Sequence, residues 1–174
     1  MNDVIKNMIE RRSVRKFKPD MPAREDIEQI VQAGLYAPSG MNLQGSIIIA
    51  ITNKEQRDRL AVLNAAIMGA EGMDPFYGAP VVLIVLDPKN AFSQVYDGSL
   101  VMGNLLNAAH SLGLGSIWIH RAKEEFETPQ YKQFLADLGI EGEWEGIGHC
   151  ALGYADCDLP AAPARKPGRA FFVD

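Results

Sequence analysis

The run Ala79-Pro80-Val81-Val82-Leu83-Ile84-Val85-Leu86 is the longest apolar stretch of the chain, and it decides the kind of fold that the rest must complete. The run is short, apolar throughout and rich in β-branched residues, so it predicts a strand that is buried on both faces. Eight residues are far fewer than the roughly 18 that a membrane-spanning helix needs.

Helix and strand patterns alternate on either side of this strand. The run Ile47-Ile48-Ile49-Ala50-Ile51 predicts a second buried strand within residues 45–52. Further strands are expected at residues 116–119 and 146–153. Helices are expected at residues 3–12, 22–36 and 93–112, after the capping residue Asn53, and after Thr128-Pro129.

The expected helix at residues 93–112 is apolar nearly all round, which indicates a central helix covered on several sides. No repeat or linker divides the chain. We therefore expect one domain over residues 1–174.

Composition excludes several other classes of protein. The 174 residues are 47% hydrophobic and 22% charged, which rules out a disordered, collagen-like or coiled-coil chain. The net charge of −5 argues against a nucleic-acid partner, and no span points to a membrane. The N-terminus shows no secretion signal, and two cysteines are too few for a disulfide framework, so we predict a cytoplasmic protein. The histidines and cysteines have no metal-ligand spacing, so no metal is expected.

Basic residues collect at both ends of this acidic chain. Six of the 17 lysines and arginines lie in the first 18 positions, and Arg165, Lys166 and Arg169 lie in the last ten. They could surround one small anion, or they could simply be solvated termini, and charge alone leaves both interpretations open. The tail from Asp158 is proline-rich and ends in Phe171-Phe172-Val173, which suggests that it packs on a second copy of the chain.

Two short segments carry candidate binding groups. In Arg-Arg-Ser-Val-Arg at 11–15, an extended backbone would place Arg11, Ser13 and Arg15 on one side, an arrangement that suits a phosphate. A solvated basic stretch is the alternative. Residues 37–44, Ala-Pro-Ser-Gly-Met-Asn-Leu-Gln, gather short polar groups before a buried strand, although the same residues are common in plain turns.

Taken in order, these segments and three others resemble the FMN-dependent nitroreductase family over the whole chain. The other three are Phe-Tyr-Gly-Ala-Pro-Val-Val at 76–82, Leu-Gly-Leu-Gly-Ser-Ile-Trp-Ile at 112–119, and Gly153-Tyr154 with Pro-Ala-Arg-Lys-Pro at 163–167. The resemblance implies a fold of the α+β class, in which a central mixed or antiparallel sheet has helices on both faces. It also implies an intertwined homodimer with two FMN sites at its interface, each built from both chains. It also implies that residues 158–174 form an arm that packs on the partner subunit.

The resemblance also assigns roles to residues. Arg11 and Ser13, with Arg12 adjacent, would hold the FMN phosphate, and Arg165 and Lys166 would return to it from the far end of the chain. Arg15 would lie near N1, where a cation favours reduced flavin. The remaining expected cofactor-binding residues are Pro38, Ser39, Asn42 and Gln44 from the partner, and Trp118, Ile119 and His120 along the ring. The backbone N–H of His120 would donate to N5, and no side chain is required as an acid or base.

The implied function is an oxidoreductase in which NAD(P)H reduces FMN, which then reduces an electron-poor acceptor, such as a nitroaromatic or a quinone, in ping-pong order. Two alternatives are a non-catalytic flavin-binding or sensor protein and a specialised relative such as a reductive dehalogenase. The chain departs from the family at Gln44-Gly45-Ser46, where many members have proline and tryptophan. It also lacks the asparagine and lysine that some members carry just before the second strand; Asn64 lies further upstream.

Overall fold

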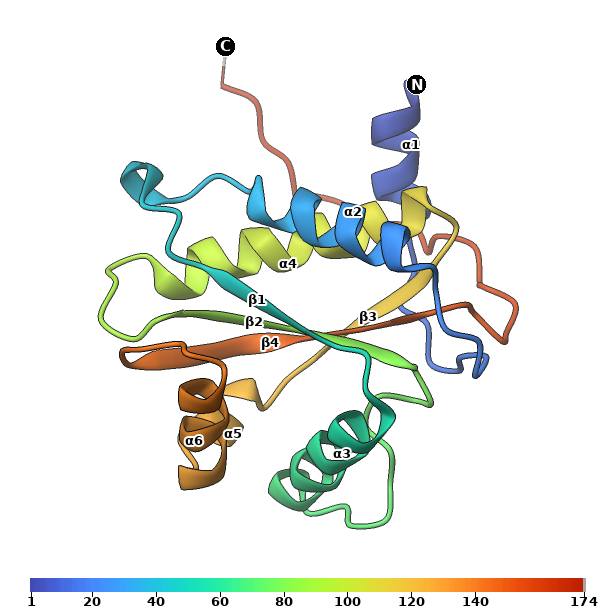
Figure 1. Ribbon diagram of the computed structural model, residues 1–174. Helices are drawn as coiled ribbons and strands as arrows, with labels where there is room; N and C mark the ends of the chain where they lie inside the picture. Colours follow the sequence, from blue (N-terminus) through green and yellow to red (C-terminus); the bar gives the residue numbers. More distant parts are fainter. Residues whose placement is uncertain (174) are drawn as a thin grey trace.

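An antiparallel sheet with strand order β1-β2-β4-β3 crosses the centre of the molecule (Figure 1). The computed structural model describes residues 1–173. The strands are β1 (Ile47–Ile51), β2 (Val81–Pro88), β3 (Gly115–Ile119) and β4 (Trp144–Gly153). The long strands β2 and β4 lie in the middle, and β1 and β3 form the two edges. The sheet is thus wholly antiparallel, which confirms the expected α+β class.

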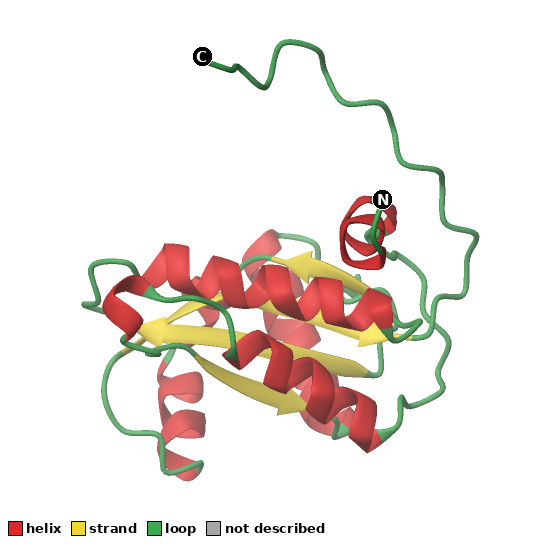
Figure 2. Ribbon diagram, turned by 90° about the horizontal axis from the view of Figure 1, so that it is seen from above, coloured by secondary structure: helices red, strands yellow, loops and turns green. Residues whose placement is uncertain are grey.

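Helices cover both faces of the sheet, as expected (Figures 1 and 2). The helices α2 (Arg24–Leu35) and α4 (Gln94–Ser111) lie on one face, here called the α4 face. The other face, here called the α3 face, is covered by α3 (Lys54–Met68), α5 (Ala122–Phe126) and α6 (Pro129–Asp137). The short helix α1 (Asp3–Glu10) lies beyond α4, and a 3-10 turn η1 (Gly40–Asn42) precedes β1.

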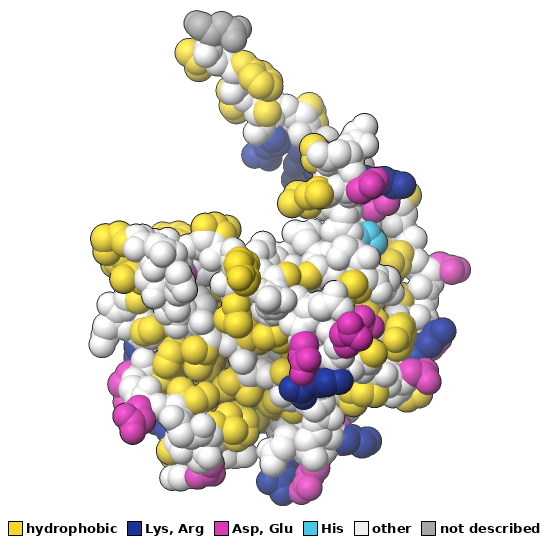
Figure 3. Space-filling model, turned by 45° about the horizontal axis from the view of Figure 1, so that its top comes forward, with side chains coloured by type: hydrophobic (Ala, Val, Ile, Leu, Met, Phe, Trp, Pro, Cys, Tyr) yellow, Lys and Arg dark blue, Asp and Glu magenta, His cyan; other side chains and the backbone are white. Residues whose placement is uncertain are grey.

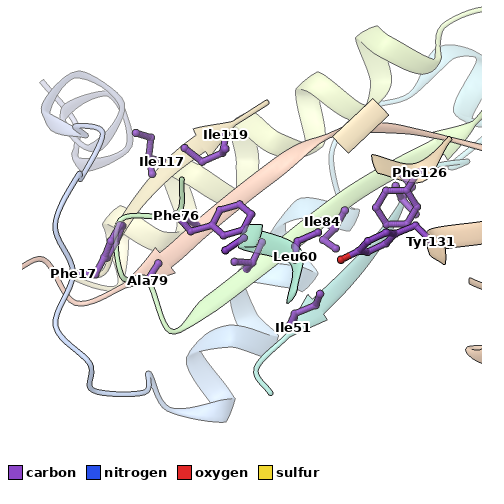
Figure 4. Packing of buried hydrophobic residues seen from close by; sticks show 14 of the residues in the cluster. Phe17, Ile51, Leu60, Phe76, Ala79, Ile84, Ile117, Ile119, Phe126 and Tyr131 are labelled. Atoms are coloured by element: carbon purple, nitrogen blue, oxygen red, sulfur yellow. The ribbon is translucent and has the colours of Figure 1, made fainter. Parts of the chain in front are cut away.

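Alternation along the strands builds two separate cores. Leu83 and Val85 of β2 point to the α4 face, where they meet Ile30 and Leu105 of the covering helices. Ile84 points the other way and packs with side chains of α3, α5 and α6 (Figure 4). Residues 81–87 of β2 are all buried, which confirms the strand predicted from the apolar run.

The predicted helix boundaries are confirmed where a cap was recognised. The Asn53 side chain accepts a hydrogen bond from the Gln56 backbone N–H at 3.0 Å and begins α3. Thr128 caps α6 in the same way. The first helix ends at Glu10 rather than at residue 12, because the chain becomes extended at Arg11. Helix α5 was missed, because five residues are too few to show the repeat of apolar residues that marks a helix.

One expectation about α4 is wrong for the single chain. Its inner side is buried against the sheet and α2, but the outer side chains Val95, Tyr96 and Leu100 are 47–75% exposed. Helix α1 buries none of its residues, although its apolar stripe includes Val4 and Met8. Figure 3 shows hydrophobic side chains spread over this side of the molecule.

The C-terminal arm leaves the body of the fold after β4. An ion pair between Lys16 and Asp156, at 2.7 Å, lies where it leaves. From Asp156 to residue 173 every side chain is exposed, and the arm extends away from the sheet (Figure 2). The last residue of the expected arm and domain, residue 174, lies outside the described residues. None of the helices described within residues 1–173 has the length and hydrophobicity to cross a membrane.

Candidate functional site

The basic segment at residues 11–17 runs beside the edge strand β3. Ser13 forms a parallel bridge with Ser116, and the Val14 backbone N–H donates to the Ser116 carbonyl at 3.1 Å. Val14 is fully buried over Gly115, where a Cβ atom would come within 2.7 Å of its side chain. Alternation therefore turns Ser13 and Arg15 away from the core.

Several polar groups in this region are buried without a hydrogen-bond partner. They include Nη1 of Arg11 and Oγ of Ser116. Burial raises the pKa of the Cys150 thiol to about 12, and the nearby positive charge of Arg11 opposes that rise. The charge of Arg11 thus acts on Cys150, whose side chain packs in the core of the α4 face. An unpartnered buried donor or acceptor costs about 1–3 kcal/mol, so these groups call for a polar ligand.

Arg12 behaves differently from its neighbour. Its Nη1 donates to the carbonyls of Ile9 at 2.7 Å and of Arg11 at 2.5 Å, which closes the last turn of α1. Its Nε is buried without a partner. One side of this guanidinium is thus already used for helix capping, whereas no such use is seen for Arg11.

The second group of expected residues lies where β3 ends. The rings of Trp118 and His120 lie on the same face with centroids 5.8 Å apart, whereas the Ile119 side chain enters the core on the α3 face. Only the backbone of Ile119 can therefore reach a ligand on the side of Trp118. Nε1 of Trp118 is buried without a partner. A cavity of about 590 Å³ opens here, and its lining includes Val95, Ser99, Trp118, His120, Arg121 and Glu145.

The 37–44 loop lies at the β1 edge and is held in a strained conformation. Met41, Asn42 and Gln44 have φ values of 50°, 56° and 51°, in the left-handed region that non-glycine residues rarely adopt. The Ser39 hydroxyl accepts from the Gln44 backbone N–H at 2.9 Å, and the Gln44 amide donates to Asn42 Oδ1 at 2.9 Å. These bonds keep the polar groups of the loop in one arrangement.

A buried carboxylate secures the loop to α4. The Gly40 backbone N–H lies 3.0 and 3.2 Å from the two oxygens of Asp97, which also accepts from the Ser93 hydroxyl at 2.7 Å. A Cβ atom at position 40 would lie 2.5 Å from Ser93 Oγ and 2.9 Å from the Phe92 ring, so a larger residue would displace the Ser93 hydroxyl that Asp97 accepts from. Strain combined with such a tether is typical of functional loops.

The single chain does not bring the 37–44 loop and the arm residues Arg165 and Lys166 to the residues beside β3. Val95 and Ser99 of α4 face the cavity beside Trp118, whereas Asp97 and Val101 line a separate cavity of about 190 Å³ with Pro38 and Ser39. Positions two apart on a helix point in nearly opposite directions. The 37–44 loop and the end of β3 therefore lie on opposite sides of α4. Arg165 and Lys166 are exposed on the arm, away from the body of the fold (Figure 2).

Some residues at the site were missed by the sequence analysis. Ser116 could have been found, because it lies in the family-like segment 112–119, directly after Gly115; the structure pairs it with Ser13. Asn64 is fully buried, and its amide donates to the His120 carbonyl at 3.0 Å, so it supports the end of β3 from the core. Asp97 carries no sequence signal that separates it from an ordinary helix residue. A cavity of about 770 Å³ along α3 contains none of the expected residues.

These features define a class of protein. It is an α+β domain that has cationic and hydroxyl groups suited to an anionic ligand at the β3 edge of the sheet. At the β1 edge it has a polar loop that Asp97 holds in place. The buried unpartnered atoms of Arg11 and Ser116, beside the outward-facing Ser13, fit the phosphate of a nucleotide cofactor. The indole of Trp118 lies further along the same strand and fits a ring system.

Comparison with known proteins identifies the family. A family model described as the nitroreductase family matches residues 8–74 and 67–154. An FMN reductase [NAD(P)H] of Bacillus subtilis is 28% identical over 80% of this chain and 66% of its own length. An NADPH-flavin oxidoreductase of Vibrio harveyi is 30% identical over 68% of this chain and 54% of its own.

A solved structure agrees with these sequence matches. The nitroreductase of Bacteroides fragilis with bound FMN superposes with a TM-score of 0.90 at 26% identity, and the match covers 100% of both chains. The chain belongs to the nitroreductase family, which confirms the resemblance seen in its motifs. It spans about two thirds or less of the length of the two curated relatives named above.

Proposed function

We propose that this protein binds FMN and uses NAD(P)H to reduce electron-poor acceptors, such as nitroaromatics or quinones, in a ping-pong reaction. The observation that carries the proposal is the pair of unpartnered buried atoms, Arg11 Nη1 and Ser116 Oγ, beside Ser13. Similarity to an FMN reductase and to an FMN-bound nitroreductase supports the same cofactor. The exposed free thiol of Cys157 favours a reducing, cytoplasmic setting.

The phosphate would be held at the start of the chain. Arg11 can donate two parallel hydrogen bonds from its guanidinium to the phosphate. Ser13 and Ser116, which face each other in a β-bridge, can each donate one from a hydroxyl. Arg12 would contribute through its free Nε, since its Nη1 closes α1. Arg165 and Lys166 would add positive charge once the arm is docked on a partner. Arg15 is exposed and turned the same way as Ser13, so it can place a cation near N1.

The ring would lie beside the end of β3. Bound FMN would supply the hydride-accepting centre, while the protein positions it and excludes water. Trp118 and His120 offer two neighbouring aromatic rings, tilted by 33° to each other, and the His120 backbone N–H is the donor that we assign to N5. Reduced flavin carries negative charge at N1, which a fixed Arg15 guanidinium would stabilise.

A homodimer would complete the site. In one chain, α4 separates the 37–44 loop from the end of β3, and the outer side of α4 is apolar and exposed. A two-fold partner that covers α1 and α4 would bring its own Pro38, Ser39, Asn42 and Gln44 to this chain's β3. Each site would then contain residues of both subunits.

The absorbance spectrum of the purified protein, followed by anaerobic titration with NADH and NADPH, tests this function. We expect a bound flavin that is identified as FMN after release by heat. Its absorbance should fall when NADH or NADPH is added and should recover when a quinone is added. Bleaching without recovery would indicate a flavin store or sensor instead. A protein that is colourless and cannot be reconstituted with FMN would refute the proposal.

A further inference from the structure

A pair of ionisable side chains is completely buried behind the end of β3, and no role has yet been assigned to it. His149 of β4 and Glu125 of α5 are both 0% exposed, and His149 Nε2 lies 2.6 Å from Glu125 Oε2. Replacing a buried ion pair by apolar residues is often neutral or stabilising, so such a pair is weak evidence for a role in stability alone. What the pair contacts is therefore the more informative question.

The other ring nitrogen of His149 faces the backbone of β3. Nδ1 lies 3.3 Å from the carbonyl oxygen of Ile119, the residue paired with His149 across the two strands. The imidazole ring is thus held between the Glu125 carboxyl and the backbone of β3, with one ring nitrogen facing each of them.

The carbonyl of Ile119 and the N–H of His120 belong to one planar trans peptide, so the two groups point in opposite directions. The carbonyl points inward to His149. Because β3 is an edge strand, the N–H points away from β4 and toward the open edge. Hydrogen bonds in a chain polarise one another, so a donor on the carbonyl makes the N–H of the same peptide a stronger donor.

The next peptide is held from the same side. The Asn64 amide donates to the His120 carbonyl at 3.0 Å and also to Glu125. Arg121, which adopts a left-handed φ of 81°, donates from Nε to Asn64 Oδ1 at 2.9 Å. Glu125 therefore organises contacts to two successive carbonyls, and the chain turns sharply just after them. The end of β3 is fixed by side chains of α3, α5 and β4.

We propose that His149 and Glu125 are positioning residues, which orient and polarise the 119–120 peptide so that the His120 N–H donates to N5 of FMN. This inference rests on the proposed function. Neither side chain touches the cofactor. Their effect passes through one peptide group, so it should change hydride acceptance at N5 while leaving the phosphate contacts untouched.

The test compares His149→Gln and Glu125→Gln with wild type, each reconstituted with FMN that carries ¹⁵N at N5. Both variants should bind oxidised FMN within about threefold of wild type. The N5 resonance should move toward its position in free FMN, and the rate of anaerobic reduction at saturating NAD(P)H should fall about tenfold. Phe76→Leu is the matched control, because Phe76 packs edge-on against the His149 ring, with centroids 5.3 Å apart, and makes no hydrogen bond to it. The control should move neither the N5 resonance nor the rate.

The wild-type protein supplies a further measurement if a variant does not fold. Adding FMN should shift the Nδ1 resonance of His149, because one peptide joins the two groups. An unchanged N5 resonance in both variants, or an unmoved Nδ1 resonance in wild type that has bound FMN, would overturn the inference and leave the proposed function standing. Failure of wild type to bind FMN would overturn both.

Discussion

The two faces of the sheet are covered by helices whose outer surfaces differ in kind. On the α3 face, the outer surface of α3 carries ion pairs such as Lys54–Asp58 and Arg59–Glu55. On the α4 face, the outer surface offers Tyr96 and Leu100, and α1 beyond it buries nothing. Both inner surfaces are well packed. The difference indicates that the outer surface of α3 suits water except at the cavity that Val62 and Leu63 line, whereas the outer surface of the α4 face is suited to a second protein surface. The α4 face is also where the candidate cofactor site lies.

The largest effect is expected from deleting the arm, residues 158–174. Phe171 and Phe172 of the arm are exposed in the single chain. Burying each of these side chains against a partner would stabilise the dimer by about 1.5–3 kcal/mol. Without the arm, we expect a monomer or aggregate that has lost FMN. Light scattering and the flavin absorbance check this. A truncated protein that stays dimeric and yellow would mean that the arm is not part of the interface.

A charge placed on each face gives the next contrast. Leu100→Asp on α4 should break the dimer, because it would bury an unpaired carboxylate in an apolar interface. Met68→Asp on α3 is the matched control: Met68 is 37% exposed, close to the 47% of Leu100, and does not line the cavity along α3. Sedimentation should show a monomer for the first variant and a dimer for the second. Two dimers would remove α4 from the interface.

The sequence predicted features that local patterns record and missed those that depend on contacts between distant elements. Alternation and capping are local, so β2, the Asn53 cap and the α6 start were read directly. The apolar outer side of α4 was also read, but period alone cannot tell whether its covering comes from the same chain or from another. Motifs named Arg11 and Ser13, whereas Asp97 and His149 act through contacts between elements distant in sequence. No local pattern records such contacts.

Within the site, Arg11→Ala should weaken FMN binding ten- to a hundredfold. The substitution removes charge-assisted hydrogen bonds worth about 1.5–3 kcal/mol each. Fluorescence titration of the cofactor-free protein measures the dissociation constant. Arg169→Ala, a basic residue of the exposed arm that has no assigned contact, is the control and should bind FMN normally. Equal binding by the Arg11 variant and wild type would show that its unpartnered guanidinium does not face the phosphate.

Arg15→Ala should act on the reduced cofactor instead of on the phosphate. Loss of a cation near N1 should lower the flavin midpoint potential by tens of millivolts, since about 30 mV corresponds to 1.4 kcal/mol for a two-electron couple. Arg15→Lys keeps the charge without the planar fork and should give an intermediate value. Spectroelectrochemistry on the two variants decides between this role and a solvated basic residue. A potential that is unchanged with FMN fully bound would remove Arg15 from the site.

The smallest effect concerns Asp87. This residue lies near the end of β2, on the side of α4, and close to the end of the 37–44 loop. The side chain is 1% exposed, accepts a hydrogen bond from Ser46, and has Asp97 nearby. Burial, and then the charge of Asp97, raise the pKa of this carboxyl above its usual value, while the Ser46 bond lowers it. The folded state therefore binds a proton more tightly than the unfolded state does. Stability from this group is fully present below its unfolded pKa and is lost as pH rises through the folded pKa.

Asp87→Asn keeps an oxygen acceptor for Ser46 and removes the charge. At pH 7 the variant should consequently be more stable than wild type by about 0.5 kcal/mol, the size of a modest substitution effect. The gain should shrink as the pH falls below the raised pKa, because wild-type Asp87 is then also uncharged. Urea unfolding of both proteins at pH 7 and in the acid range measures the difference, which cancels the contributions of every other carboxylate. If the difference in free energy of unfolding did not depend on pH, the charge of Asp87 would not be what destabilises the wild-type protein.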